Sequence, residues 1–179
     1  MDVILREMAQ EDIELVRSWR NQPEVSKYMY TDGYISEEQQ QKWFDAMHSD
    51  HTNKYWMINY NGTDIGVASL YGISQVLSSC YWAFYLGDTT NQGVGIGSKI
   101  EFNVLDYVFN TLKLNKLRCE VIVFNEKVTS MHEKFGFRRE AYYRQHVKKD
   151  GRWQDVVGLA MLREEWKNYR EVMRTKIYR

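Results

Sequence analysis

Apolar residues recur every three or four positions in several segments, a spacing that predicts amphipathic helices. In the clearest segment Ile100, Val104, Val108 and Leu112 are four residues apart and would share the buried face of one helix. Residues 36–39, Ser-Glu-Glu-Gln, form a capping box, which indicates a helix start. The other predicted helices lie at residues 11–20, just after Pro23, at 125–135 and from about 163 onwards.

Strand-like runs lie between these helices. They span residues 3–6, 55–60, 65–71, 81–86, 117–124, 138–147 and 153–161. Asn61-Gly62, between the second and third runs, favours a type I′ turn and therefore a β-hairpin. This order of elements predicts an α+β or mixed α/β domain with a mixed sheet flanked by helices. The chain has no linker, repeat or low-complexity tract, so we expect residues 1–179 to form a single domain.

A glycine-rich segment, Gln92-Gly93-Val94-Gly95-Ile96-Gly97-Ser98, follows the run at 81–86 and precedes a predicted helix. Glycines allow successive backbone N–H groups to turn toward one ligand, and a helix N-terminus adds partial positive charge. The segment could therefore bind a pyrophosphate, or it could be only a tight connection. Its spacing does not match the dinucleotide pattern GxGxxG, and the Lys of a Walker loop does not directly follow Gly97.

The pattern Gln92-x-x-Gly95-x-Gly97 resembles the acyl-CoA pyrophosphate loop of the GNAT acetyltransferase superfamily. Residues 125–137, Asn-Glu-Lys-Val-Thr-Ser-Met-His-Glu-Lys-Phe-Gly-Phe, are similar to a second segment of that family, and the resemblance spans about residues 3–166. It implies a GNAT-like fold with a central, mostly antiparallel mixed sheet and one N-acetyltransferase domain that uses acetyl-CoA and needs no metal.

The resemblance also implies how acetyl-CoA would be held. The residues concerned are Leu86, Gln92, Gly93, Val94, Gly95, Gly97, Ser98 and Asn125. Backbone N–H groups of the glycine segment would bind the pyrophosphate, and Leu86 would lie beside the pantetheine. Asn125 would hydrogen-bond the cofactor arm, although it could equally be a plain N-cap for the helix that it begins.

His132 stands where the family usually has the Tyr that acts as the acid. An imidazolium could protonate the departing thiolate, but burial would lower its pKa, so a packing or cofactor-contact role stays open. The run at 81–86 contains no carboxylate that could act as the base. An ordered water could relay the proton, and Glu120 and Asp155 are alternatives only because they are carboxylates on predicted strands.

Several segments resemble the N-acetyltransferases of pseudaminic-acid biosynthesis, which acetylate the 4-amino group of a UDP-linked 4-amino-4,6-dideoxy sugar. They are residues 19–25, 27–30 and 35–36, with Trp43, and residues 65–70 and 155–157. In such an enzyme Arg20 could pair with the diphosphate. Met29, Tyr30 and Tyr81 could cover the sugar methyl group, or they could simply be core residues. One departure stands out, because Gln40 occupies a position where these relatives carry a His.

Two other functions remain open. Residues 146–151 and 162–166 are similar to ribosomal-protein N-terminal acetyltransferases, which acetylate a terminal alanine. The fold could also bind acetyl-CoA without turnover, as a sensor or scaffold.

Composition narrows the setting. Lys plus Arg and Asp plus Glu number 24 each, so no global charge favours nucleic acid or an anionic membrane as partner. We expect a soluble, cytoplasmic protein with a small-molecule amine substrate and with Cys80 and Cys119 as reduced core thiols. His48 and His51 lack a third metal ligand nearby. A homodimer is left open.

Overall fold

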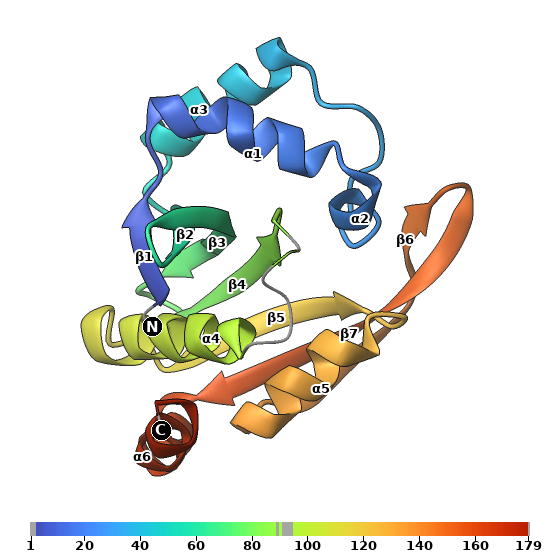
Figure 1. Cartoon of the computed structure of the whole chain (residues 1–179). Helices are drawn as coiled ribbons and strands as arrows, with labels where there is room; N and C mark the ends of the chain where they lie inside the picture. The colour runs from blue at the N-terminus through green and yellow to red at the C-terminus, as the bar shows by residue number, and fades with distance from the viewer. Residues whose placement is uncertain (1–2, 89, 91–94, 179) are drawn as a thin grey trace.

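A seven-stranded mixed sheet forms the centre of the computed structural model, which describes residues 3–88, 90 and 95–178 (Figure 1). Its strands lie in the order β1-β2-β3-β4-β5-β7-β6. The strands are β1 (Val3–Glu7), β2 (Lys54–Tyr60), β3 (Thr63–Ser74), β4 (Ser79–Leu86), β5 (Lys116–Ile122), β6 (Arg138–Lys149) and β7 (Arg152–Leu162). Only β4 and β5 pair in parallel. The prediction of a mixed, mostly antiparallel sheet is therefore confirmed.

Helices cover both faces of this sheet (Figure 1). On one side lie α1 (Ile13–Arg20), preceded by the short η1 (Gln10–Asp12), α2 (Pro23–Ser26) and α3 (Glu37–Ser49). On the other lie α4 (Ile96–Asp106), η2 (Tyr107–Thr111), α5 (Glu126–Phe135) and α6 (Arg163–Ile177). The predicted capping box is present, since the Ser36 hydroxyl accepts from the backbone N–H of Gln39 at 3.2 Å.

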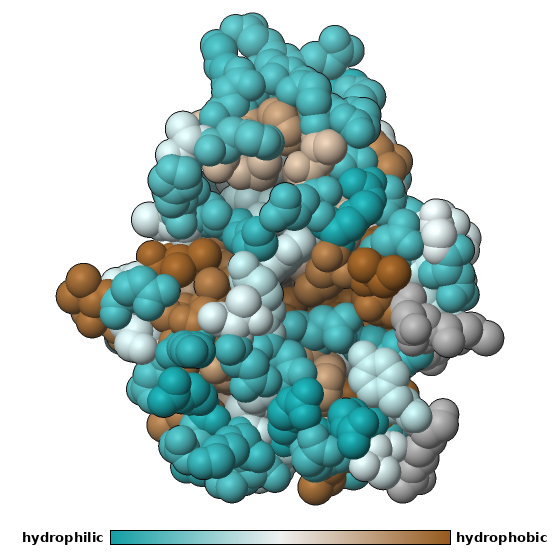
Figure 2. Space-filling model, turned by 90° about the vertical axis from the view of Figure 1, so that its left-hand side faces the viewer, coloured by the Kyte–Doolittle hydropathy of each residue, from teal (hydrophilic) through white to brown (hydrophobic). Residues whose placement is uncertain are grey.

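Two hydrophobic clusters hold these layers together. On β2, Trp56 and Ile58 face the larger cluster with α4 and α6, while Met57 between them faces a smaller cluster with α1 and α3. This alternation follows from the period of two along a strand. On the face shown in Figure 2, apolar surface gathers in a band between more hydrophilic upper and lower parts.

The helix predicted from Ile100 to Leu112 does not continue as one α-helix. α4 ends at Asp106 and is followed by a π-helical turn, in which the backbone N–H of Leu112 donates to the carbonyl of Tyr107 at 2.9 Å. The wider turn lets Val108 and Phe109 both be buried, at 0% and 2% exposure.

β4 and β5 separate soon after they meet. Their pairing covers Ser79, Cys80 and Tyr81 of β4 against Lys116, Leu117 and Arg118 of β5, and no further residues. Beyond that point the two strands diverge (Figure 1), so the backbone of residues 82–86 faces β5 without ladder hydrogen bonds to it. A sheet that opens in this way leaves room for a ligand between its strands.

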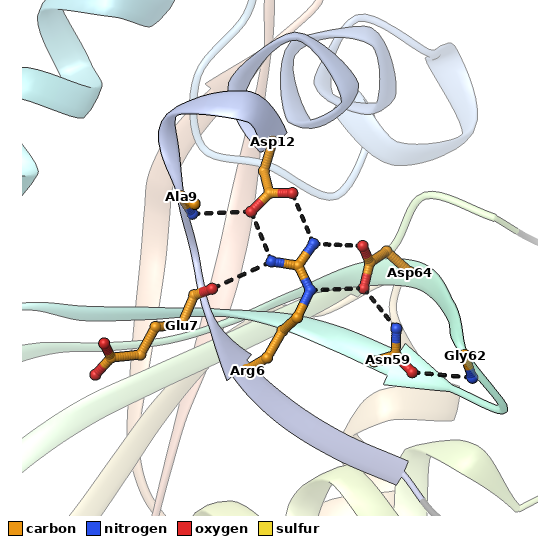
Figure 3. Close-up of polar contacts among 7 residues, drawn as sticks. All are labelled: Arg6, Glu7, Ala9, Asp12, Asn59, Gly62 and Asp64. Carbon is orange, nitrogen blue, oxygen red and sulfur yellow. Dashed lines mark hydrogen bonds and ion pairs between the residues drawn. The ribbon is translucent and has the colours of Figure 1, made fainter.

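Arg6 joins β1 to η1 and to the β2–β3 hairpin (Figure 3). Its Nη1 and Nη2 donate to the two carboxylate oxygens of Asp12 at 2.8 and 2.6 Å, and it also pairs with Asp64. The backbone N–H of Ala9 donates to Asp12 at 2.8 Å, and Asn59 donates to Asp64 at 2.8 Å. The guanidinium hydrogen bond holds the pKa of Asp12 below its usual range.

Replacing Asp12 by Ala removes two charge-assisted bonds from Arg6 and leaves the Ala9 N–H without its acceptor. We expect a loss of about 2 kcal/mol in the free energy of unfolding at pH 7, measured by urea denaturation. Because the folded pKa of Asp12 is depressed, this contribution is present above pH ~4 and fades as the pH falls through the folded pKa. Lys42→Ala, which breaks an ion pair exposed by 74% and 76%, is the control and should cost at most about 0.5 kcal/mol. Equal losses of unfolding free energy in the two variants would contradict a stabilising role for the Arg6–Asp12 pair.

Candidate active site

A cavity of about 1330 Å³ occupies the opening between β4 and β5. It is lined by residues 82–86 of β4 and 119–122 of β5, by the N-terminal end of α4, and by α5 along its length. Residues of β2 and β3 and side chains of α1, α3 and the segment between them complete the wall. Pockets for a single small ligand usually measure about 300–1,000 Å³. The volume therefore leaves room for two substrates side by side.

One end of the cavity lies at the N-terminus of α4, where it is lined by Gly95, Gly97 and Ser98, three of the residues expected to hold acetyl-CoA. Gly95 is the N-cap with φ +76°, a left-handed conformation that favours glycine. A Cβ on Gly97 would lie 2.9 Å from the Met131 sulfur, so a larger residue here would have to displace the Met131 side chain. The first N–H groups of α4 can donate hydrogen bonds to a bound anion. Gln92, Gly93 and Val94 lie outside the described residues.

Asn125 lies at the start of α5 and lines the cavity. Its backbone carbonyl accepts from the N–H groups of Val128 and Thr129, at 3.1 and 3.2 Å. Its side chain makes no capping hydrogen bond. Asn125 is therefore the N-cap residue of α5, but its side-chain amide takes no part in the cap and is available to a ligand.

His132 lines the cavity from α5 and is only 3% exposed. Its Nδ1 lies 2.7 Å from the Oε1 of Glu101, a carboxylate on α4 with 0% exposure. The rings of Trp82 and Phe137 pack against the imidazole at centroid distances of 5.2 and 5.3 Å. The sequence analysis missed Glu101, although an acidic residue in so apolar a helix was a signal.

The electrostatics of His132 differ from the expectation of a depressed pKa. Burial does lower the pKa of the imidazole, but the charges of Glu101 and Cys119 and hydrogen bonds with both outweigh it and raise the pKa to about 10. Burial raises the pKa of Glu101, against the opposing effect of His132. The pair therefore holds a proton throughout the neutral range.

The opposite end of the cavity contains buried polar atoms without hydrogen-bond partners in the described part of the chain. They are the Arg20 Nε, the Gln40 Nε2 and the Tyr85 hydroxyl. All three residues line the cavity, and Gln40 is only 4% exposed. Unsatisfied buried donors are uncommon in folded proteins, and they indicate a site that a polar ligand completes.

The predicted acceptor residues do not all reach the cavity. Arg20 and Met29 line it. Tyr30 is not among the residues that line the cavity. Its hydroxyl donates at 2.8 Å to Glu120, which does line the cavity. Tyr81 is also absent from the wall, because its ring is stacked on Tyr71 at 5.3 Å.

Glu120, rather than Asp155, is the strand carboxylate at the cavity. Asp155 lies outside the lining set and accepts from the Tyr142 hydroxyl at 2.6 Å and the Gln145 N–H at 2.7 Å. Hydrogen bonds from Tyr142 and Gln145 hold the pKa of Asp155 below its usual range.

Metal-ligand groups, membrane-spanning helices and cysteines bear on the class of protein rather than on the reaction mechanism. Among residues 3–88, 90 and 95–178, no group of three or more His, Cys, Asp or Glu side chains is arranged to hold a metal ion. In the same ranges, none of the helices combines the length and apolar composition that a bilayer crossing requires. Cys80 and Cys119 are free and buried, as expected.

Comparisons with known proteins agree with this geometry. The family model of the acetyltransferase (GNAT) domain matches residues 2–138. Acetyltransferase PseH of Campylobacter jejuni is 28% identical over 131 residues, which cover 73% of this chain and 80% of that protein. Spermidine N(1)-acetyltransferase of Vibrio cholerae is 23% identical over 168 residues, which cover 93% and 96% of the two chains.

The fold is also similar to that of a solved structure, spermidine N-acetyltransferase from Vibrio cholerae in complex with CoA and spermine. The TM-score is 0.88 at 23% sequence identity, and the match covers 93% of this chain and 99% of the other. At this identity the likeness concerns the fold.

Proposed function

The chain belongs to the GNAT acetyltransferase domain family and transfers an acetyl group from acetyl-CoA, and from this premise we propose that its acceptor is the amino group of a nucleotide-linked amino sugar. The best-fitting acceptor is the 4-amino group of a UDP-linked 4-amino-4,6-dideoxy sugar. The observation that carries this proposal is the Arg20 guanidinium in the acceptor half of the cavity, whose Nε is buried without a hydrogen-bond partner among the described residues.

Acetyl-CoA fits the half of the cavity nearer α4 and α5. The first N–H groups of α4, beside Gly95, Gly97 and Ser98, would bind the pyrophosphate, and the free amide of Asn125 would hydrogen-bond the pantetheine arm. Leu86 would lie along that arm. Residues 82–86 offer strand N–H and C=O groups that β5 does not use, and these could hold the extended chain of the cofactor.

The chemistry then needs few groups. The neutral amine attacks the thioester carbonyl, and the tetrahedral intermediate expels the CoA thiolate. His132 is the acid that would protonate this thiolate, because its Nδ1 is held by Glu101 and its Nε2 can donate once it gives up any contact with Cys119. A thiol has a pKa of only about 8.5, so modest assistance is enough.

The Arg20 guanidinium favours an anionic acceptor, although acidic side chains line the same part of the cavity. The lining includes the basic residues Arg20, Lys27, Lys127 and Lys134 and the acidic residues Glu24, Asp32 and Glu120. Asp32 is paired with Lys149, and Glu120 accepts from Tyr30. None of the ion pairs in the described ranges involves Arg20. An unpaired guanidinium suits a diphosphate and opposes a polycation.

A polyamine is the second candidate, because relatives of comparable similarity are spermidine acetyltransferases. Glu120 at the cavity wall is the residue that could receive a cationic amine. This carboxylate would have to outweigh Arg20, which is why we place the polyamine second.

The acceptor can be tested directly by measuring free-thiol release from acetyl-CoA. The UDP-linked 4-amino sugar, spermidine and a ribosomal-protein N-terminal peptide are offered separately. We expect kcat/KM for the nucleotide sugar to exceed both others by about 100-fold or more, because a site built to hydrogen-bond specific polar groups discriminates strongly against acceptors that lack them. A preference for spermidine or for the peptide would overturn the acceptor. Absence of thiol release with all three, despite CoA binding in calorimetry, would favour a non-catalytic module.

Asn125→Ala should raise the KM for acetyl-CoA about three- to tenfold, the equivalent of one hydrogen bond of about 0.5–1.5 kcal/mol. The free energy of unfolding should stay within about 0.5 kcal/mol of the original, because the side chain makes no capping bond. Ser36→Ala is the matched control. Its hydroxyl does cap a helix, so we expect a loss of about 1 kcal/mol in stability and no change in KM. A stability loss in the Asn125 variant with unchanged KM would contradict the cofactor role.

A further inference from the structure

Glu101 is a carboxylate at the centre of an apolar core. It is 0% exposed, and its neighbours on α4 include Ile100, Phe102, Val104 and Leu105, each 5% exposed or less. Its Oε1 contacts His132 at 2.7 Å, and within the described residues its Oε2 is buried without a partner. Taking a carboxylate out of water without full compensation costs several kcal/mol. Packing alone gives no reason for an acid here.

The arrangement around His132 shows what this acid can do. Apart from Glu101, the titratable group that acts on the imidazole from a neighbouring element is the Cys119 thiol of β5. Trp82 of β4 and Phe137, just after α5, contribute only rings. Glu101 therefore has the strongest influence on the orientation and charge of the ring.

We propose that Glu101 is a positioning residue of the acetyl transfer, which fixes the His132 ring through Nδ1 and keeps it positively charged so that Nε2 can protonate the departing CoA thiolate. The inference rests on the proposed role of His132 as the acid. It concerns the transfer to any amine and does not depend on which acceptor is used.

The proton balance of the step is closed. The acceptor nitrogen forms a bond to the acetyl carbon, the C–S bond breaks, and its electron pair goes to sulfur. Nε2 of His132 gives its proton to that sulfur, which leaves the neutral imidazole beside the Glu101 carboxylate. The proton lost by the acceptor nitrogen passes to solvent, and His132 regains one from solvent. No oxidant, reductant or metal is required.

This arrangement compensates for the departure from the usual Tyr. A buried imidazole by itself loses its proton near or below neutral pH, whereas a phenol keeps its proton to about pH 10. Against the effect of burial, Glu101 and Cys119 together raise the pKa of His132 to about 10 as well. Glu101 and His132 together would then provide an acid of about the strength that Tyr would supply alone.

The first test is an NMR titration of the side chains of the four histidines, with His132 assigned by comparison with His132→Asn. In the unmodified protein we expect His132 to stay protonated to about pH 10. In Glu101→Gln, which keeps a hydrogen-bonding side chain but removes the charge, we expect titration below pH ~6.5. Cys119→Ala is the matched control and should shift the titration less. Titration of His132 below pH 7 in the unmodified protein would overturn the proposal whether or not any variant folds.

The second test is kinetic and uses whichever amine the thiol-release assay identifies. In Glu101→Gln we expect kcat at pH 8 to fall about tenfold or more, with the descending limb of its pH profile moved to lower pH and the KM for acetyl-CoA changed less than about threefold. In a His132→Tyr background, where a phenol supplies the acid, Glu101→Gln should change kcat less than about threefold. A shifted titration with unchanged kcat would show that His132 is not the acid and would overturn the proposal. A failed acceptor assignment would leave these measurements valid with another amine.

Discussion

Arg20→Met is expected to raise the KM for the nucleotide-linked sugar by about 10- to 100-fold, because charge-assisted hydrogen bonds to a diphosphate contribute about 1.5–3 kcal/mol. In the protein as described, Arg20 donates to the Thr31 hydroxyl at 3.2 Å, and its Nε is buried without a partner. The variant therefore gives up little internal bonding. We expect an unchanged KM for acetyl-CoA and a free energy of unfolding at least as large as before, measured by steady-state kinetics and urea denaturation.

Two controls make this result specific. Arg20→Lys keeps the charge but loses the planar pair of donors, so its KM for the nucleotide-linked sugar should lie between those of the unmodified protein and Arg20→Met. The amino sugar without its nucleotide should be a poor acceptor for all three proteins, and its KM should be nearly the same for each of them. If Arg20→Met impairs the truncated acceptor as strongly as the complete one, Arg20 acts on the sugar or on the fold and not on the diphosphate. If spermidine becomes a worse acceptor in Arg20→Met, the cationic alternative gains support.

Local signals in the sequence predicted most of the fold, because each is decided by a few neighbouring residues. Asn61 and Gly62 have φ values of 51° and 86°, as a type I′ turn requires. Gly136 ends α5 with φ 102°. The helix predicted through Leu112 instead changes to a π-turn after Asp106, since the position of Phe109 against the core is a tertiary effect.

The residues of the candidate site also separate into those that local sequence predicts and those that depend on tertiary packing. The turn at Gly95 and the amide of Asn125 could be predicted because a recognisable motif places them. Glu101 could not be predicted, because its partner His132 lies on another helix, 31 residues away in sequence, and a helical wheel shows only neighbours on the same helix. Tyr81, which was expected to cover the sugar methyl group, does not line the cavity. Its sequence suggested a pocket wall, whereas stacking on Tyr71 and the Arg118 guanidinium 4.1 Å above its ring hold it elsewhere.

The acceptor half of the cavity depends on one more contact that the sequence did not reveal. The segment from Lys27 to Ile35 forms part of the cavity wall. Lys149, at the end of β6, is 6% exposed, and its Nζ donates to the carbonyls of Ser26 and Thr31 at 3.2 and 3.1 Å and pairs with Asp32. One buried ammonium therefore ties the wall to the β6–β7 hairpin, more than 100 residues away in sequence.

Lys149→Met should accordingly raise the KM for the acceptor by about tenfold, since a displacement of about 1 Å in a positioning element can cost up to 10²-fold. The KM for acetyl-CoA should not change, because α4 and Asn125 do not contact this segment's anchor. Lys149 holds the pKa of Asp32 below its usual range, so Asp32→Asn should weaken the tie while leaving the two carbonyl contacts, and its effect on KM should be smaller. Lys148→Met, on the neighbouring exposed side chain, is the matched control and should leave both constants unchanged. Equal effects of the Lys148 and Lys149 variants would show that hairpin charge, and not the buried tie, governs acceptor binding.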